Sequence, residues 1–527
     1  MKSKALEVLY MKRITTTALL LAMLLSLYGC GGGENPEKEN VDTDNTTTQT
    51  ESTETETETE DLFAAYRSID LGGRTVHISV SSNISEGGGG MPSSYPYIAG
   101  PEEMTGEAVA DSVYMRNQNV EELLHCKLEH IALDLEFDKV QPYIENMVIS
   151  GDTAIDYYVN DQLGLLHCGV KGYLLDLNKK ENFTDYYFDF ASGAYYYDYM
   201  RGLSIGKKQF IMTGPYFIDT LRAAHVLYMN KNIYADLYGD ANGLYEIVKE
   251  NKWTLDMLNT LVEEAYQDLN GDGNVDDGDR YGISVHSKTW SMPYYAIYYS
   301  TDAHVVEFDD KNIPYISESN LERISMATDK LIRLHQCKGT YKLTSVAESL
   351  QKFVDGQSLF TMFQKVGDME QSSIREFDGM GMIPYPLLDE TQDHYRTLIH
   401  DTAEMGAVPI TSAGEAAAAV SAVVQVLSTD AAQNMVSLYY DTALKSKYAQ
   451  DSYTAEMLDI VSAGITAPFE FAYEFGFGSD SYLNTISFMP VADSITKGTN
   501  ITASSFAKKL SRAQEKLAEL VRIYTEE

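Results

Sequence analysis

The stretch "NKWTLDMLNTLVEEAYQDLNGDGNVDDGDRYGI", residues 251–283, predicts a helix, an acidic loop and a strand in succession. Thr254 has the side chain of a helix N-cap. Apolar residues recur behind it at helical spacing, namely Leu255, Leu258, Leu261, Val262 and Ala265. The β-favouring residues of "RYGISV" follow the loop directly. A helix that passes through a short loop into a strand is typical of a mixed α/β fold.

The loop itself, residues 268–279, has the oxygen spacing of a calcium loop, and Gly273 in the sixth place allows the sharp turn. Its last residue is an aspartate, which is shorter than the glutamate of an EF-hand. An acidic Gly/Asn turn without metal is the alternative. Because one loop leads into a strand and not into a second helix, we expect a structural Ca²⁺ that fixes a corner. The expected ligands are Asp268, Asn270, Asp272, Asn274 through its carbonyl, Asp276 and Asp279.

Further elements of both kinds extend along the chain on either side of this corner. Alternating or continuous apolar runs predict strands at 74–80, 154–160 and 226–230. Helical spacing predicts helices at 113–126, 414–428 and 505–524. No repeat of solenoid or propeller length is present. A chain of 527 residues with this pattern predicts an α/β protein of two lobes.

The N-terminal region predicts export. Residues 11–30, "MKRITTTALLLAMLLSLYGC", have a basic start, a short apolar run and a small residue before Cys30. "LYGC" resembles a bacterial lipobox, although Tyr28 is bulkier than the usual residue. We therefore expect a signal peptide at 1–29 and lipidation at Cys30; an ordinary signal with a chance cysteine is the alternative. The acidic, Thr/Glu-rich residues that follow predict a solvated tether, so that 30–61 join the anchor to the folded part.

Charge and cysteine content narrow the classes of partner. A net charge of −38 opposes binding to phosphate backbones, so we expect no nucleic-acid partner. Cys126, Cys168 and Cys337 show no metal-ligand spacing and are odd in number, which predicts buried thiols and no disulfide framework.

Six ordered stretches resemble the extracellular solute-binding proteins of ABC importers, specifically the family 1, maltose-binding-protein-like group. "GKKQFIMTGPYFIDTLRAAHVLYMNKNIYADLYG" resembles the block of that family which ends in "YNKDLFxxxG", and "FVDGQSLFTMF" resembles its "FxxGKAAMxx" segment. One departure is the absence of a proline before Trp253. The stretches are 154–177, 206–239, 251–283, 353–363, 379–390 and 407–428.

The resemblance implies a two-lobed, periplasmic-binding-protein-like class II fold with hinge crossings, into which the calcium loop is inserted. Lobe 1 would comprise 62–218 plus 386–442, and lobe 2 would comprise 222–382 plus 446–527. The crossings would lie near 218–221, 382–386 and 442–446. It further implies a monomer on the extracellular face of the cell membrane, held by its lipid, that delivers a solute to separate ABC permease subunits.

Within the resemblance, candidate ligand residues are aromatic and planar polar side chains near the lobe junction. Such side chains pack on the C–H faces of sugars and hydrogen-bond to their hydroxyls. The candidates are Tyr158, Asn160, Asp161, Tyr216, Phe217, Asp219, Arg222 and Trp290. The aromatic stretch 469–479 is a further candidate for the cleft.

The family mostly serves oligosaccharides, so we expect a carbohydrate, with a peptide or another polar solute as the alternative. An enzyme is not expected. "GLSIGKK" is one residue short of a phosphate loop, and no HExxH or G-x-S-x-G motif occurs. A secreted glycoside-active enzyme stays open in principle, because its two carboxylates need no fixed spacing. An adhesion module would require repeats that are absent.

Overall fold

Each of the two larger β-sheets is built from strands that lie far apart in the sequence. The computed structural model describes residues 61–82, 93–135, 137–440, 452–475 and 482–526. Its four-stranded sheet has the order β11-β3-β1-β2, in which β11 alone is antiparallel to its neighbour. The strands are β1 (Thr75–Ser81), β2 (Lys127–Leu133), β3 (Tyr157–Asp161) and β11 (Glu404–Ala407).

The second sheet has five strands in the order β10-β4-β9-β5-β8. Strand β9 is parallel to β5 and antiparallel to β4, so the sheet is mixed. Its strands are β4 (Leu227–Asn230), β5 (Tyr281–His286), β8 (Thr340–Leu343), β9 (Ser358–Thr361) and β10 (Met380–Ile383). A separate hairpin pairs β6 (Val306–Phe308) with β7 (Pro314–Ile316).

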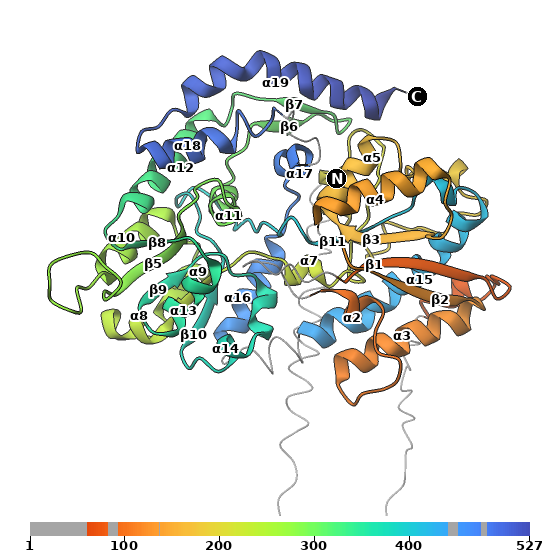
Figure 1. Cartoon of the computed structure of the whole chain (residues 1–527), viewed down its shortest axis with the longest axis horizontal. Coiled ribbons are helices and arrows are strands. Elements are labelled where there is room, and N and C mark those ends of the chain that lie inside the picture. Colours follow the sequence, from red (N-terminus) through yellow and green to blue (C-terminus); the bar gives the residue numbers. More distant parts are fainter. Residues whose placement is uncertain (1–60, 83–92, 136, 441–451, 476–481, 527) are drawn as a thin grey trace, which may run out of the picture. The chain divides into compact units, whose positions relative to one another are not determined.

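Helices cover both sheets, and Figure 1 shows α4 and α5 on one side of β1 and β3 with α3 on the other. The first lobe includes η1 (Ala64–Tyr66), α2 (Tyr95–Ile98), α3 (Ala108–Leu124), α4 (Phe137–Ser150), α5 (Gln162–Val170), η2 (Lys180–Asn182), α6 (Tyr197–Gly202), η4 (Ile410–Ser412) and α15 (Glu415–Ser437). The second includes α8 (Lys231–Tyr238), α9 (Gly243–Lys249), α10 (Leu255–Ala265), α11 (Met292–Ser300), α12 (Leu321–Gln336), α13 (Val346–Val354), η3 (Val366–Glu370) and α14 (Ser372–Arg375).

The predicted strands and helices are all present. Thr254 accepts a hydrogen bond from the Met257 amide at the start of α10, as an N-cap does. The corner after α10 also leads into strand β5, as predicted. Gly339 and Gly282 lie so close to Val262 that a Cβ on either would overlap its backbone oxygen, at 1.9 and 2.2 Å. These glycines let α10 pack directly against β5 and its neighbour.

Two crossings between the sheets lie within the described residues. The first contains the short helix α7 (Asp219–Arg222), at the predicted position. The second runs beside it at 397–403, where the His225 amide donates to the Leu398 carbonyl and the His400 amide donates to the Ala223 carbonyl. The sequence predicts this crossing at 382–386, which is earlier in the chain than 397–403. At that point Pro384 still accepts a hydrogen bond from Trp253 in the second lobe. The third, at 442–446, falls outside the described residues, and the lobe boundaries themselves stay predictions.

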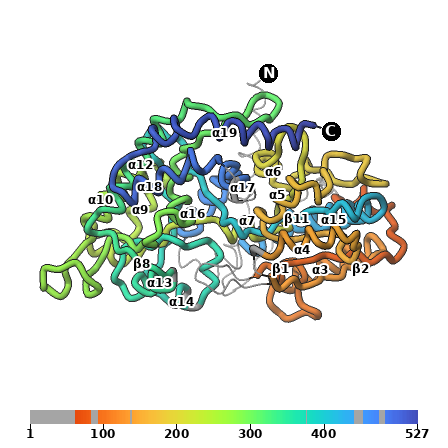
Figure 2. Tube along the Cα trace, turned by 45° about the horizontal axis from the view of Figure 1, so that its top comes forward, coloured from red at the N-terminus to blue at the C-terminus, as the bar shows by residue number. Residues whose placement is uncertain are grey.

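The C-terminal helices contact both lobes. These are α16 (Ser452–Ala463), α17 (Phe469–Phe475), α18 (Phe488–Lys497) and α19 (Thr502–Thr525). Figure 2 shows α19 running from beside α12 to the region of α5 and α6. There Tyr473 donates a hydrogen bond to the Leu203 carbonyl and meets the Tyr524 hydroxyl at 2.7 Å. Lys208 Nζ donates to the carbonyls of Ile523 and Glu526, at 3.2 and 3.0 Å.

Candidate functional site at the hinge

The helix α7 presents two charged side chains of the predicted set on one face. Asp219 and Arg222 are three residues apart, and their closest oxygen and nitrogen are separated by 2.6 Å. Both are buried, and Arg222 has no exposed side-chain surface. Burial raises the pKa of Asp219, although the Arg222 guanidinium opposes that rise.

Arg222 also pairs with Glu370 of η3, so the hinge is tied to the second lobe. Its Nε and Nη2 donate to the two Glu370 oxygens at 3.0 and 3.2 Å, a bidentate arrangement. Glu370 in turn accepts hydrogen bonds from the hydroxyls of Tyr97, in α2, and Tyr439, just after α15. The Arg222 guanidinium lies 4.5 Å from the centre of the Tyr97 ring. One carboxylate therefore links the hinge, the first lobe and the second lobe.

A second pair of carboxyl groups lies beside this network, and neither forms an ion pair within the described residues, although the charge of Arg222 acts to lower the pKa of Glu404. Asp161 ends β3 and pairs directly with Glu404, the first residue of β11. Asp161 also caps α5, since its Oδ1 accepts the Gly164 amide at 2.7 Å. Burial raises the pKa of Asp161 to about 7. Burial, with the neighbouring Asp219 charge, raises the pKa of Glu404 well above its usual range.

Several buried polar atoms at this junction lack a hydrogen-bond partner. They include Asp161 Oδ2, the Tyr216 hydroxyl and both side-chain polar atoms of Asn160. Burial raises the pKa of Tyr216 to about 12; nearby Arg116 opposes that rise and Glu404 adds to it. Unsatisfied polar groups are costly in a protein interior, and they are commonly kept where a ligand or water completes them.

The other predicted site residues lie in different surroundings. Tyr158 and Asn160 are three and one residues before Asp161, so strand alternation places them on the opposite face of β3; Tyr158 lies in the apolar core. Phe217 is buried close to Gly406. Trp290 is 58% exposed and follows β5 at the start of α11, with Lys288 Nζ 5.3 Å from its ring centre. Asp219 and Arg222 form a direct pair, and Asp161 and Tyr216 each lie near Glu404 beside that pair.

Five residues of the network, Tyr439 among them, had no signal in the sequence. Ser94 donates a hydrogen bond to Glu404, from a segment 310 residues away. Tyr97, Glu370 and Glu404 complete the contacts described above. Their neighbours in sequence form no motif, and only the strand register and the path of the hinge bring them together.

A tyrosine-rich pocket lies next to the hinge on the other face of α7. Thr220 and Leu221 form part of its wall, and its volume is about 820 Å³. The remaining lining comes from the α6 region, the end of α15 and α16. It consists of Tyr195, Tyr196, Tyr197, Asp198, Tyr199, Ala432, Val436, Ser437, Tyr440, Asp459, Ser462, Ala463 and Ile465. Aromatic faces beside carboxylates in a space of this size suit a small polar solute.

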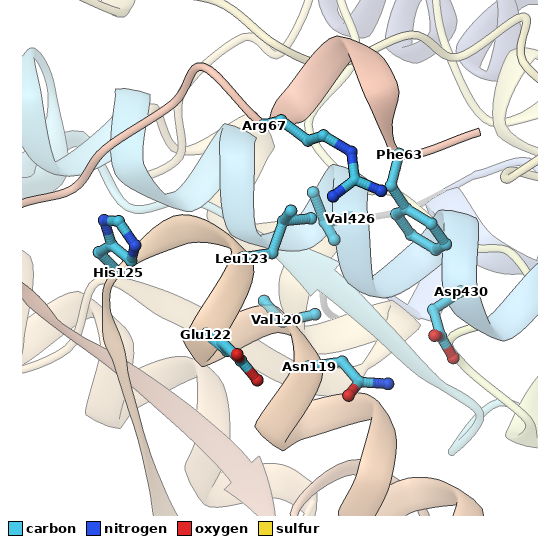
Figure 3. A pocket seen from close by; sticks show the side chains of 9 residues that line it. All are labelled: Phe63, Arg67, Asn119, Val120, Glu122, Leu123, His125, Val426 and Asp430. Atoms are coloured by element: carbon cyan, nitrogen blue, oxygen red, sulfur yellow. The ribbon is translucent and has the colours of Figure 1, made fainter. Parts of the chain in front are cut away.

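A second pocket of about 550 Å³ lies away from the hinge, where η1 packs on α3 and α15. Figure 3 shows Phe63 and Arg67 reaching over Leu123 and Val426. It includes none of the predicted ligand residues.

The acidic loop between α10 and β5 is folded on its own backbone. Asp268 accepts the amides of Gly271 and Gly273 at 2.6 and 2.9 Å. Asp279 has no exposed surface; its Oδ2 accepts the Tyr266 hydroxyl at 2.7 Å, while its Oδ1 has no hydrogen-bond partner. No group of three or more His, Cys, Asp or Glu side chains within the described ranges is arranged to hold a metal ion.

The three cysteines of the folded part are free thiols, and the prediction that they are buried holds for two of them. Cys126 and Cys168 are buried and Cys337 is half-buried. Burial raises the pKa of Cys126 to about 11, which makes it a poor nucleophile at neutral pH. Cys30 lies outside the described residues.

Comparison with known proteins gives a clear likeness in fold alone. No family model matches the chain, and no curated protein matches it in sequence. The sugar-binding protein MalE from Xanthomonas citri has a TM-score of 0.53 at 10% identity, covering 86% of this chain and 100% of its own. UgpB from Mycobacterium tuberculosis, in complex with glycerophosphocholine, has a TM-score of 0.52 at 12% identity, covering 85% and 98%. The galacto-N-biose-/lacto-N-biose I-binding protein of the ABC transporter from Bifidobacterium longum has a TM-score of 0.51 at 13% identity, covering 86% and 98%.

The chain therefore has the two-lobed α/β fold of the solute-binding proteins of ABC transporters. The expectation that the chain is a binding protein and not an enzyme stays a prediction. No helix in the described part of the chain is long and apolar enough to cross a bilayer.

Proposed function

We propose that this protein captures a carbohydrate, in particular an oligosaccharide, between its two lobes and delivers it to an ABC permease. The observation that carries the proposal is the polar network at the hinge, in which Arg222 and Glu370 connect both lobes around unsatisfied polar atoms. Hinge bending at α7 would open this junction to a solute. Tyrosines line the adjacent pocket and supply the flat faces that sugar rings pack against.

The test is a thermal-shift screen of the purified protein against mono- and oligosaccharides, peptides and glycerophosphodiesters. A ligand that binds the native state alone raises the melting temperature, by an amount equivalent to about 2.7 kcal/mol at a hundredfold excess over Kd. We expect one class of glycan to raise it, with no product formed. A rise in melting temperature with peptides or glycerophosphodiesters alone would identify that class of solute, and not a carbohydrate, as the cargo. Cleavage of a glycan would favour an enzyme.

We further propose that Cys30 carries the lipid that holds the protein at the outer face of the cell membrane, where it acts as a monomer. The support is the lipobox-like "LYGC" and the acidic tether behind it. Mass spectrometry of the mature protein is expected to find an acylated N-terminal cysteine; an unmodified N-terminus elsewhere would contradict the anchor.

We also propose that the loop at 268–279 binds Ca²⁺ as a structural ion. The support is its set of oxygen side chains and the unpartnered, fully buried Oδ1 of Asp279, an atom that a cation would satisfy. The residues that would hold the ion are Asp268, Asn270, Asp272, Asn274, Asp276 and Asp279. The ion would neutralise these carboxylates and fix the corner.

Adding Ca²⁺ to chelator-treated protein is therefore expected to raise its melting temperature. The Asp272→Ala variant removes one expected ligand from an exposed position and should lose most of that rise. Asp277→Ala is a matched control, because Asp277 lies in the same loop but pairs with Lys352. If the wild type melts at one temperature with and without Ca²⁺, the loop is only a turn.

A further inference from the structure

Asp161 and Glu404 form a pair of carboxyl groups on neighbouring strands. They are direct partners in the antiparallel register of β3 and β11. Residues so paired have their Cβ atoms about 4.5–5.5 Å apart and their side chains on one face of the sheet. Both side chains are buried, with 9% and 5% of their surface exposed. Two like charges placed this way repel each other unless something lies between them.

Two basic side chains in this region form ion pairs with carboxylates other than Asp161 and Glu404. Arg222 pairs with Asp219 and Glu370, although its charge also acts to lower the pKa of Glu404, and Lys365 Nζ lies 3.7 Å from Asp368. Among the described residues, no Lys, Arg or His forms an ion pair with Asp161 or Glu404. Glu404 receives one hydrogen bond from Ser94, and the Asp219 carboxylate accepts the Glu404 amide, which brings a third negative group close.

Independent of the charges, two buried polar atoms here lack partners. Asp161 Oδ2 accepts no hydrogen bond, although Oδ1 does. The hydroxyl of Tyr216 also has no partner, and Tyr216 is fully buried. An acceptor and a hydroxyl left open beside two buried carboxyl groups form a site that a hydrogen-bond donor with positive charge would complete, and that charge would favour the ionised form of both carboxyl groups.

We propose that the solute carries a protonated amino group, as an amino sugar does, and that this ammonium lies between Asp161 and Glu404. The inference rests on the proposed function and specifies the class of its cargo. An ammonium has three N–H donors, enough for both carboxylates and the Tyr216 oxygen. An ammonium therefore needs fewer oxygen partners than a metal ion, since Ca²⁺ needs six or more. A neutral sugar would supply no positive charge to favour the ionised form of the two carboxyl groups.

The deciding experiment is isothermal titration calorimetry of the full-length protein at pH 7 with matched sugars. Glucosamine, galactosamine and the disaccharide of glucosamine are each compared with their N-acetylated forms, and cellobiose serves as the hydroxyl analogue. We expect a free-amine sugar to bind at least tenfold more tightly than its N-acetylated form. The Asp161→Asn and Glu404→Gln variants are each expected to reduce that ratio to below threefold.

Asp156→Asn is the matched control. Asp156 is also buried beside the four-stranded sheet, but it has basic partners, His77 at 3.1 Å and Arg74 at 3.8 Å. This variant should keep the preference for the amine. Equal or tighter binding of the N-acetylated or hydroxyl sugars by the wild type would overturn the inference and leave the proposed function intact. Binding of no sugar at all would count against the proposed function, and the inference would fall with it.

Discussion

Replacing Arg222 by methionine is expected to lower the free energy of unfolding at pH 7 by about 3–5 kcal/mol, the range typical of breaking a buried ion pair. The side chain has no exposed surface, and it holds Asp219 at 2.6 Å and Glu370 at 3.0 Å. Methionine fills much of the same volume but leaves both carboxylates without their cation. Urea denaturation followed by circular dichroism measures the loss, with the denaturant dependence checked to be unchanged.

The pH dependence of the stability loss in Arg222→Met shows whether the loss comes from the missing charge or from poorer packing. Burial raises the pKa of Asp219 even with Arg222 present, and without Arg222 the largest effect that opposes that rise is lost. The penalty in Arg222→Met is present above the ordinary carboxyl pKa, near 4 in the unfolded chain. It is complete above the raised pKa of Asp219 in the folded variant and declines as the pH falls from there towards the ordinary carboxyl pKa, because a protonated Asp219 needs no cation. The stability gap between wild type and variant should therefore narrow between pH 7 and pH 4. A gap that stays constant would show that packing is responsible.

Truncation to alanine should lower the stability of the fold strongly at one tryptophan and hardly at the other. Trp253 is fully buried, donates from Nε1 to the Pro384 carbonyl at 3.0 Å and lies 5.8 Å from the Phe360 ring. Trp253→Ala should destabilise the fold by about 3–5 kcal/mol, through the cavity and the stranded carbonyl. Trp290 is 58% exposed, so Trp290→Ala should change stability by less than about 0.5 kcal/mol.

Affinity for the solute should depend more on Trp290 than on Trp253, which is the reverse of the order expected for stability. If Trp290 packs on the solute, Trp290→Ala should weaken affinity by about two- to tenfold, the equivalent of roughly 0.5–1.5 kcal/mol for an aromatic contact. Because the chain has two tryptophans, each variant leaves one fluorescent reporter. A solute-induced change in emission should persist in Trp253→Phe and vanish in Trp290→Phe. A change that vanishes in Trp253→Phe and persists in Trp290→Phe would place the solute away from Trp290.

Local features were predictable from the sequence because their causes are local. The alternation of Val76, Ile78 and Val80 predicts β1, and the Thr254 hydroxyl predicts the start of α10. The site was predictable in part: Asp161 ends a predicted strand and Asp219 lies in a predicted crossing. Glu404 and Glu370 were not, because their importance depends on strand register and on contacts over 148 residues or more. Strand alternation alone would have separated Tyr158 from Asp161.

The contact between α19 and the first lobe bears on how the protein is made. Lys208 and its carbonyl partner at Ile523 are 315 residues apart. At a synthesis rate of about 5–20 residues per second, the first is translated roughly 15–60 s before the second. During that interval the backbone around Leu203 and the ring of Phe210 lack the Tyr473 and Tyr524 side chains that later cover them. This part of the first lobe is therefore covered only after the ribosome has translated Tyr473 and Tyr524.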